Sequence, residues 1–293
     1  MMETIPAKTI VQKPQKGGWF GAEYNMNIYR GCSHGCIYCD SRSECYQIKD
    51  FDAVKAKENA LDTIKRDLES KRNTGVIMTG SMSDPYNPKE KEHELTRRAL
   101  MLIRDNGFGV AIATKSALII RDIDILSGIK ARAPVLAKIT ITAADDSVSD
   151  IIEPNASPSS ARFGAVRALS DAGIYCGVLL MPVLPFITDT EENIKRVVAL
   201  SAESGAKFIY PAFGMTLRTG NREYFYSKLD VHFPGVKQKY IERFGQSYEC
   251  GSPDAKRLWS TFAALCGKYG LLYKMSDIVG AYRRDEQKQL TLF

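Results

Sequence analysis

Long apolar runs are absent from this sequence, and no stretch approaches the ~18–20 apolar residues that a membrane-spanning helix needs. Residues 1–19 also lack the apolar core of a signal peptide, so we do not expect export. These absences, with 44% hydrophobic and 25% charged residues, predict a globular cytoplasmic protein without a membrane partner. A length of 293 residues permits one large domain, or one domain plus an appendage.

The cysteines do not follow the pattern of a disulfide scaffold, which spreads an even number of them through a short secreted chain. There are seven, and three lie within eight residues, at Cys32, Cys36 and Cys39. In a reducing compartment, clustered thiols more often bind metal. Three others stand alone in apolar stretches and are interpreted as small core residues: Cys176, Cys250 and Cys266.

Positive charge is concentrated in the last part of the chain. From Gly214 to Phe293 there are 13 Lys and Arg against 8 Asp and Glu, which gives +5 of the total +6. The same segment is rich in aromatic residues. This composition is typical of nucleic-acid binding, in which cations meet phosphates and rings stack on bases. A solvated basic face over an aromatic core is the alternative, and the sequence leaves both open.

Apolar β-branched runs alternate with amphipathic helical patterns through the first two thirds of the chain. This order predicts right-handed crossovers and a mostly parallel α/β sheet, either doubly wound or curled into a barrel. In both architectures functional residues lie at the carboxyl ends of the strands. The expected strands are Asn25–Arg30, Gly75–Thr79, Phe108–Thr114, Val135–Ala143, Ile174–Pro182 and Lys207–Phe213. The expected helices are Asp52–Lys71, Lys89–Asn106, Arg121–Lys130, Pro158–Ala172 and Thr190–Ser204.

The clustered cysteines have the spacing C-x3-C-x2-C and directly follow the first expected strand. Gly31 and Gly35 allow tight backbone turns there, so that one loop can surround a single inorganic core. Three thiolates on a cubane cluster leave its fourth iron without a protein ligand. The open iron can then bind a substrate or a cofactor.

A structural zinc site is the alternative interpretation of the same cysteines. Zinc requires four ligands, and His34 or Cys45 is close enough in sequence to supply the fourth. Zinc loops, however, commonly pair cysteines as C-x2-4-C with a second distant pair, and this sequence has none. The spacing therefore favours an iron–sulfur cluster.

With the aromatic Tyr38 before its last cysteine, the motif resembles the signature of the radical S-adenosylmethionine (radical SAM) superfamily. The resemblance implies a partial (β/α)6 TIM barrel over residues 21–213, after an N-terminal arm of residues 1–20. It also implies a [4Fe–4S] cluster on Cys32, Cys36 and Cys39, and S-adenosyl-L-methionine on the open iron. One electron from a reductant such as flavodoxin or ferredoxin would then yield a 5′-deoxyadenosyl radical.

Further segments are similar to the spore photoproduct lyase, or DNA repair photolyase-like, branch of that superfamily. They are Ser83-Asp84-Pro85-Tyr86, Thr114-Lys115, and Glu153-Pro154 followed by Ser157-Pro158 and Arg162. The resemblance implies lyase-like chemistry connected with DNA repair, and cofactor contacts from Tyr38, Ser83, Lys115 and Thr142. The expected contact of Lys115 with the cofactor also has a direct physical reason, because an ammonium at a strand end can neutralise the methionine carboxylate.

Two departures argue against repair of the spore photoproduct by the lyase's own route. The lyase has a hydrogen-donating cysteine after its second strand, whereas this chain has only Ser81, Met82 and Ser83 there. Asp40 also stands where the lyase has a tyrosine. We therefore expect a relative with a different substrate, with DNA as the leading partner. The alternatives are a peptide, tRNA or small-molecule substrate, or a non-catalytic zinc-stabilised module that binds nucleic acid or a sliding clamp.

The last 80 residues are expected to form an extension of the barrel. Residues 214–288 look mostly helical and should cap the barrel. The final five resemble the peptide by which bacterial DNA repair proteins bind the sliding clamp, with contacts from Gln289, Leu290, Leu292 and Phe293. A tail folded back on the domain is the alternative.

Overall fold

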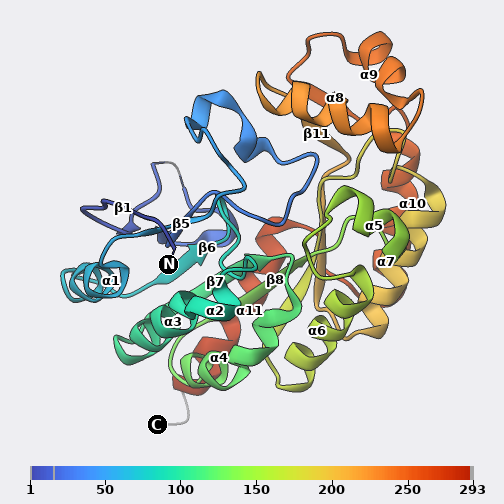
Figure 1. The fold of residues 1–293 in the computed structure, drawn as a ribbon. Coiled ribbons are helices and arrows are strands. Elements are labelled where there is room, and N and C mark those ends of the chain that lie inside the picture. Colours follow the sequence, from blue (N-terminus) through green and yellow to red (C-terminus); the bar gives the residue numbers. More distant parts are fainter. Residues whose placement is uncertain (1, 16, 291–293) are drawn as a thin grey trace.

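The central element of the protein is an open seven-stranded sheet. The computed structural model describes residues 2–15 and 17–290, with side chains through Arg283. Six strands are parallel, in the order β10-β9-β8-β7-β6-β3, and β2 lies antiparallel to β3 at one edge (Figure 1). The strands are β2 (Val11–Gln12), β3 (Tyr24–Met26), β6 (Val76–Thr79), β7 (Gly109–Thr114), β8 (Val135–Thr140), β9 (Tyr175–Leu180) and β10 (Phe208–Pro211).

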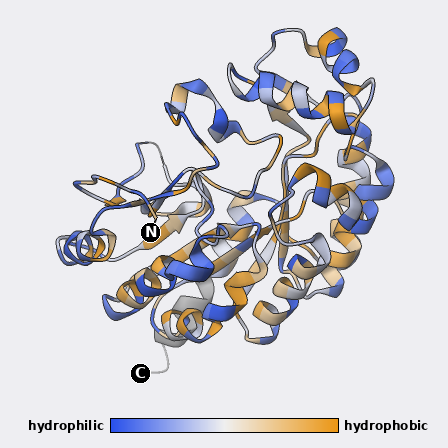
Figure 2. Cartoon of the chain, in the orientation of Figure 1, coloured by the Kyte–Doolittle hydropathy of each residue, from blue (hydrophilic) through white to orange (hydrophobic). Residues whose placement is uncertain are grey.

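Helices between successive strands cover the outer face of this sheet, which confirms the predicted partial (β/α)6 barrel (Figure 1). Each presents an apolar stripe to the strands, as Leu100 and Ile103 do from α3, and both are fully buried. Hydrophobic and hydrophilic residues therefore alternate along these helices (Figure 2). The helices are α1 (Ala60–Glu69), α3 (Leu95–Asp105), α4 (Ile123–Lys130), α6 (Ser159–Asp171) and α7 (Glu191–Glu203).

Several predicted boundaries were wrong because pairing partners lie far away in the sequence. The expected strand Asn25–Arg30 is divided between β3 and β4 (Tyr29–Arg30), which belongs to a second sheet with β5 and β1 (Thr4–Ile5). The expected helix Asp52–Lys71 begins only at Ala60, because its first part forms β5 (Lys55–Lys57) between β1 and β4.

The expected helix Lys89–Asn106 is interrupted by Glu94, whose φ of 50° separates α2 (Glu90–His93) from α3. The short helix α5 (Asp146–Ile152) was not predicted. Both features follow from loop geometry that hydrophobic periodicity does not encode.

The inner face of the sheet is covered by two segments from opposite ends of the chain. The 3-10 turn η1 (Trp19–Gly21) and helix α11 (Met275–Leu290) pack there, and Tyr282 donates a 2.7 Å hydrogen bond to the carbonyl of Phe20. Apolar side chains from five parallel strands complete this layer, namely Val76, Met78, Ala111, Ala113, Leu136, Leu179 and Phe208. The N-terminal arm and the C-terminal helix thus close the interior of the open barrel.

The C-terminal extension is mostly helical, as predicted, but only its first part lies at the strand ends. We call residues 214–251 the cap; it contains β11 (Gly214–Thr216), α8 (Asn221–His232), α9 (Val236–Phe244) and β12 (Glu249–Gly251). Helix α10 (Ala255–Tyr269) packs instead on α7 at the outer face (Figure 1). No helix in the described part of the chain is long and apolar enough to cross a membrane.

Candidate functional site

A cleft of about 570 Å3 lies where the carboxyl ends of the parallel strands meet the cap. Its size is within the range of small-molecule sites. The cluster-loop side contributes Tyr38, Cys39, Asp40 and Ser41, and the strand ends contribute Ser81, Lys115, Met181 and Pro182. The opposite wall consists of residues 212–216 and 249–251. Residues that the sequence placed after the strands line this cleft, whereas the sequence did not indicate the wall formed by β11 and β12.

The loop that carries the three cysteines is fastened to its surroundings by its backbone. Gly31 has a φ of 79°, and a Cβ atom there would lie 2.6 Å from the carbonyl oxygen of Phe51. That close approach lets the amide of Cys32 donate a 2.8 Å hydrogen bond to the same oxygen. On the other side the amide of Ile37 donates to the carbonyl of Ile152 at 2.9 Å. Backbone hydrogen bonds therefore hold the loop in position on both sides.

The three thiols are free, and their environment fits a cationic inorganic cluster. Cys32 and Cys36 are buried and Cys39 is half-buried. Burial, together with the carboxylate of Asp84, raises the pKa of Cys32 to about 12. Burial also raises the pKa of Cys36 well above its usual value, although Lys115 opposes this. Thiolates in such surroundings require a compensating positive charge, which bound iron supplies.

The zinc alternative finds no support in the geometry. In the described part of the chain no group of three or more His, Cys, Asp or Glu side chains is arranged around a single ion. A cubane does not require this arrangement, because each thiolate binds a different iron. The proposed fourth zinc ligands are also directed elsewhere: Nδ1 of the buried His34 lies 3.4 Å from Asp84, and the exposed Cys45 accepts from Arg218 at 3.3 Å.

Lys115 places a half-buried cation beside the cysteine loop. Its Nζ lies 5.6 Å from the centroid of the Tyr38 ring, and both residues line the cleft. Burial by itself lowers the pKa of Lys115, but the nearby Cys36 and Glu153 outweigh this effect and raise it. Lys115 is therefore charged and can hold an anionic group within the cleft.

Glu153 connects three of the residues identified from the sequence. Its carboxylate accepts hydrogen bonds from the hydroxyls of Tyr38 and Thr142, and forms a 2.5 Å ion pair with Arg162. Arg162 and Glu153 are both fully buried. The Glu-Pro, Ser-Pro and Arg segments thus act together, because Arg162 also donates to the carbonyls of Ser157 and Thr140 at 2.7 and 2.8 Å.

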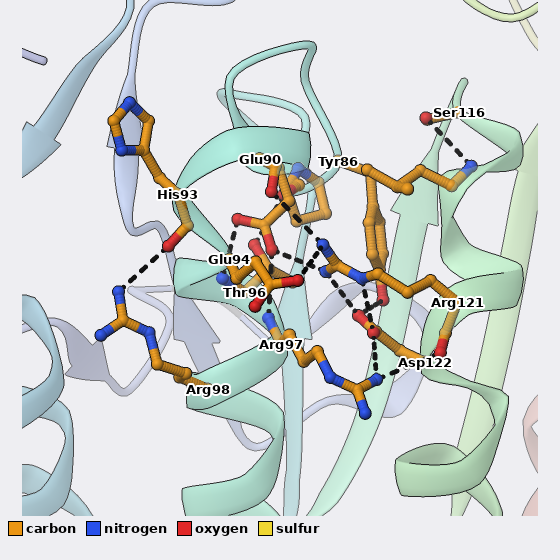
Figure 3. Close-up of polar contacts among 12 residues, drawn as sticks. Tyr86, Glu90, His93, Glu94, Thr96, Arg97, Arg98, Ser116, Arg121 and Asp122 are labelled. Carbon is orange, nitrogen blue, oxygen red and sulfur yellow. Dashed lines mark hydrogen bonds and ion pairs between the residues drawn. The ribbon is translucent and has the colours of Figure 1, made fainter.

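The Ser-Asp-Pro-Tyr segment anchors the second strand end to the third. Asp84 accepts hydrogen bonds from the Thr114 hydroxyl at 2.7 Å and from the Lys115 amide at 2.8 Å. Tyr86 donates to Asp122, which is one member of a buried network with Glu90 and Arg121 (Figure 3). This segment therefore fixes the backbone of Lys115.

Ser83 and Thr142, which were also predicted to contact the cofactor, do not lie at the cleft surface as Tyr38 and Lys115 do. The hydroxyl of Ser83 is buried and donates a 2.5 Å hydrogen bond to the carbonyl of Gly31, so it holds the cysteine loop. Thr142 is fully buried behind Glu153. Neither residue is among those that line the cleft, whereas Ser81 is. Contact of Ser83 and Thr142 with the cofactor stays a prediction.

The different positions of Ser81 and Ser83 lead to a test. We expect Ser83→Ala to lower the free energy of unfolding by about 1–2 kcal/mol, because the Gly31 carbonyl loses its buried donor. Ser81→Ala should leave stability within about 0.5 kcal/mol and weaken binding of S-adenosylmethionine. Chemical denaturation and isothermal titration calorimetry measure the two effects. Equal stability losses in both variants would contradict these assignments.

Aromatic and cationic side chains of the cap contact the segment that follows Cys39, and no local sequence pattern indicated these contacts. Asp40 accepts from Thr216 of the cap at 3.2 Å and lies 3.6 Å from Arg218. The guanidinium of Arg218 stands 4.6 Å from the Tyr248 ring. Arg42 similarly lies 4.1 Å from the Tyr224 ring. The residues come from segments about 180 positions apart, which explains why no local motif revealed them.

Comparison with known proteins identifies the class of this fold and site. The radical SAM superfamily profile matches residues 26–198, which is more than half of the chain. The chain therefore belongs to the radical SAM superfamily, a family that implies a [4Fe–4S] cluster and S-adenosylmethionine. This confirms the family inferred from the cysteine motif.

Individual relatives agree with that assignment. An uncharacterised protein of Mycobacterium tuberculosis is 27% identical over 276 residues, 91% of this chain and 80% of that protein. One of Methanocaldococcus jannaschii is 34% identical over 174 residues, 58% of this chain and 64% of that protein. The structure of spore photoproduct lyase complexed with dinucleoside spore photoproduct has a TM-score of 0.64 and 15% identity, covering 91% of this chain and 79% of that one. At this identity the similarity is one of fold.

Proposed function

We propose that this protein cleaves S-adenosylmethionine reductively and uses the resulting radical on a nucleic-acid substrate. The observation that carries the first part is a loop with three free cysteines beside a strand-end cleft, which Cys39 lines together with Lys115. Bound there, a [4Fe–4S] cluster would supply the electron that breaks a carbon–sulfur bond of S-adenosylmethionine.

The chain's own residues would have distinct tasks in this chemistry. Cys32, Cys36 and Cys39 would hold the cluster and leave one iron open for the amino and carboxylate groups of the cofactor. Lys115 would neutralise that carboxylate, since it is charged and lines the cleft. The apolar wall that includes Met181 and Pro182 would exclude water from the radical.

The nucleic-acid part of the proposal has separate support. The cap carries the pair of Arg218 and Tyr248, and an arginine–tyrosine pair of this kind can stack on bases and contact phosphates. Among solved structures with this fold, spore photoproduct lyase is found with a dinucleoside photoproduct. Another, SuiB, is bound to a precursor peptide, with a TM-score of 0.51 and 10% identity over 93% of this chain and 47% of that one. A peptide substrate is therefore the competing outcome.

Anaerobic reconstitution tests the cofactor chemistry. We expect a brown protein with about four iron and four sulfide per chain. With dithionite it should release methionine and 5′-deoxyadenosine from S-adenosylmethionine. One bound zinc, with no deoxyadenosine, would instead identify a structural metal module.

The nucleic-acid proposal is tested by gel retardation at several salt concentrations. We expect DNA binding whose affinity falls steeply with salt, because phosphate contacts release counterions. The variant Arg218→Gln should weaken binding, whereas Arg167→Gln, on the outer helix α6, should not. Absent or salt-independent binding would favour the peptide or a small molecule.

The proposed partners remain predictions. The clamp-binding peptide of Gln289, Leu290, Leu292 and Phe293 lies outside the residues whose side chains the structure describes. Removal of residues 289–293 should abolish clamp binding and leave deoxyadenosine formation intact, as pull-down and product analysis can show. A flavodoxin or ferredoxin is the expected electron donor.

A further inference from the structure

Glu153 lies at the turn between α5 and α6, and its neighbours bind directly to the cysteine loop. The carbonyl of Ile152 accepts from the amide of Ile37, and the amide of Asn155 donates to the carbonyl of His34 at 2.9 Å. The side-chain amide of Asn155 donates to the carbonyl of Ser33 at 3.0 Å. The position of Glu153 relative to Cys36 is therefore fixed by backbone contacts on both sides.

Arg162 holds the Glu153 carboxylate in its charged form. The ion pair is fully buried, and the guanidinium is also bound by the carbonyls of Ser157 and Thr140 and by the hydroxyl of Ser149. Burial by itself would raise the pKa of Glu153, but Arg162, Lys115 and the hydrogen bond from Tyr38 outweigh it and lower the pKa. The site thus contains an ionised carboxylate that is paired with Arg162 and shielded from solvent.

That charge lies against the cysteine loop. The carboxylate of Glu153 accepts the hydroxyl of Tyr38, which stands between Cys36 and Cys39 in the sequence. The residues on either side of Glu153 hold Ile37 and His34 through backbone hydrogen bonds. Glu153 itself is not among the residues that line the cleft.

We propose that Glu153 is a positioning residue that holds Tyr38 and the cysteine loop and, through its fixed negative charge, lowers the reduction potential of the cluster. A nearby anion disfavours the more negative, reduced cluster, and net charge is one of the factors that set cluster potentials. Arg162 acts in the opposite direction and keeps the carboxylate in place. The inference rests on the proposed cluster and concerns residues that do not bind it.

The experiment is redox titration of the reconstituted protein, followed by electron paramagnetic resonance. Glu153→Gln removes the negative charge and keeps the size of the side chain, so it should shift the midpoint upward by a factor of at least ten in the one-electron equilibrium, or ~59 mV. Arg162→Lys keeps the positive charge but loses most of the guanidinium hydrogen bonds, so it loosens the same buried pair without changing its charge and should leave the midpoint nearly unchanged. Equal shifts in both variants would show that loosening, and not charge, sets the midpoint.

A matched control separates charge at the cluster from the loss of any buried ion pair. Glu90 is also fully buried and pairs with Arg121 at 2.8 Å (Figure 3), but its other hydrogen-bond donors are Tyr29, Thr96 and Arg97, which lie outside the cysteine loop. Glu90→Gln should lower the melting temperature of the apoprotein as Glu153→Gln does, yet leave the midpoint unchanged.

The possible results distinguish this inference from the proposed function. An unchanged midpoint in Glu153→Gln, or the same shift in Glu90→Gln, would overturn the role of Glu153 while the cluster assignment stands. If the wild-type protein assembles no cluster, the proposed function fails first, before any variant is compared.

Discussion

Cys36→Ala is expected to abolish both iron–sulfur binding and release of 5′-deoxyadenosine. Cys36 lies at the centre of the loop between two other free thiols, and its neighbours Ile37 and Tyr38 are held by Ile152 and Glu153. With two thiolates left, the loop cannot complete the three-cysteine set that leaves a single open iron. Iron and sulfide analysis and chromatography of the products measure the effect.

Cys266→Ala is the appropriate control for that experiment. Cys266 is also free and fully buried, but it lies in α10 within the core at the outer face of the barrel. Removing its sulfur leaves a small cavity that costs roughly 1–2 kcal/mol of stability. Cluster content and product formation should equal those of the wild type. If Cys36→Ala retained four iron, the ligand assignment would be wrong.

Lys138→Met is expected to raise the free energy of unfolding by about 3 kcal/mol at pH 7. Lys138 points from β8 into the fully buried layer under η1 and α11, and its Nζ has no hydrogen-bond partner in the described part of the chain. The rings of Trp19 and Phe20 lie 4.9 and 4.7 Å away. Burial lowers the pKa of this lysine from 10.5 to about 7. A methionine of similar length has no charge to desolvate.

The stabilisation should depend on pH in a defined direction. Between pH 7 and 10.5 the unfolded chain binds more protons at Lys138 than the folded one, so wild-type stability rises with pH through this window. The advantage of Lys138→Met should therefore shrink to less than about 1 kcal/mol near pH 10. Urea denaturation of both proteins at pH 7, 8.5 and 10 measures the difference. A constant difference across this range would mean that Lys138 keeps its ordinary pKa in the fold.

Much of the fold was predictable from the sequence because short local patterns encode most of its strands and helices. The parallel strands are short apolar runs buried on both faces, such as β7 and β8, and each is followed by a helix with a clear apolar stripe. Errors arose where pairing is non-local. β5 was interpreted as the start of a helix, since only its contacts with β1 and β4 make it a strand.

The candidate site likewise has one part that local sequence patterns predict and another part that depends on contacts between distant segments. The cysteine spacing and the lysine after β7 are local signals, and the structure brings Cys39 and Lys115 to one cleft. The roles of Glu153 and Asp84 could not be predicted, because they depend on contacts with distant segments that hold the cysteine loop and Lys115. The same holds for Asp40, whose partners Thr216 and Arg218 lie in the cap.

The attachment of the cap to the segment after Cys39 joins the two walls of the cleft. Asp40 binds Thr216 and Arg218, and the amide of Glu44 donates to the carbonyl of Thr219 at 3.1 Å. Arg42 adds its contact with the Tyr224 ring. A molecule that widens the cleft must break or strain hydrogen bonds that begin at Asp40, one residue after Cys39.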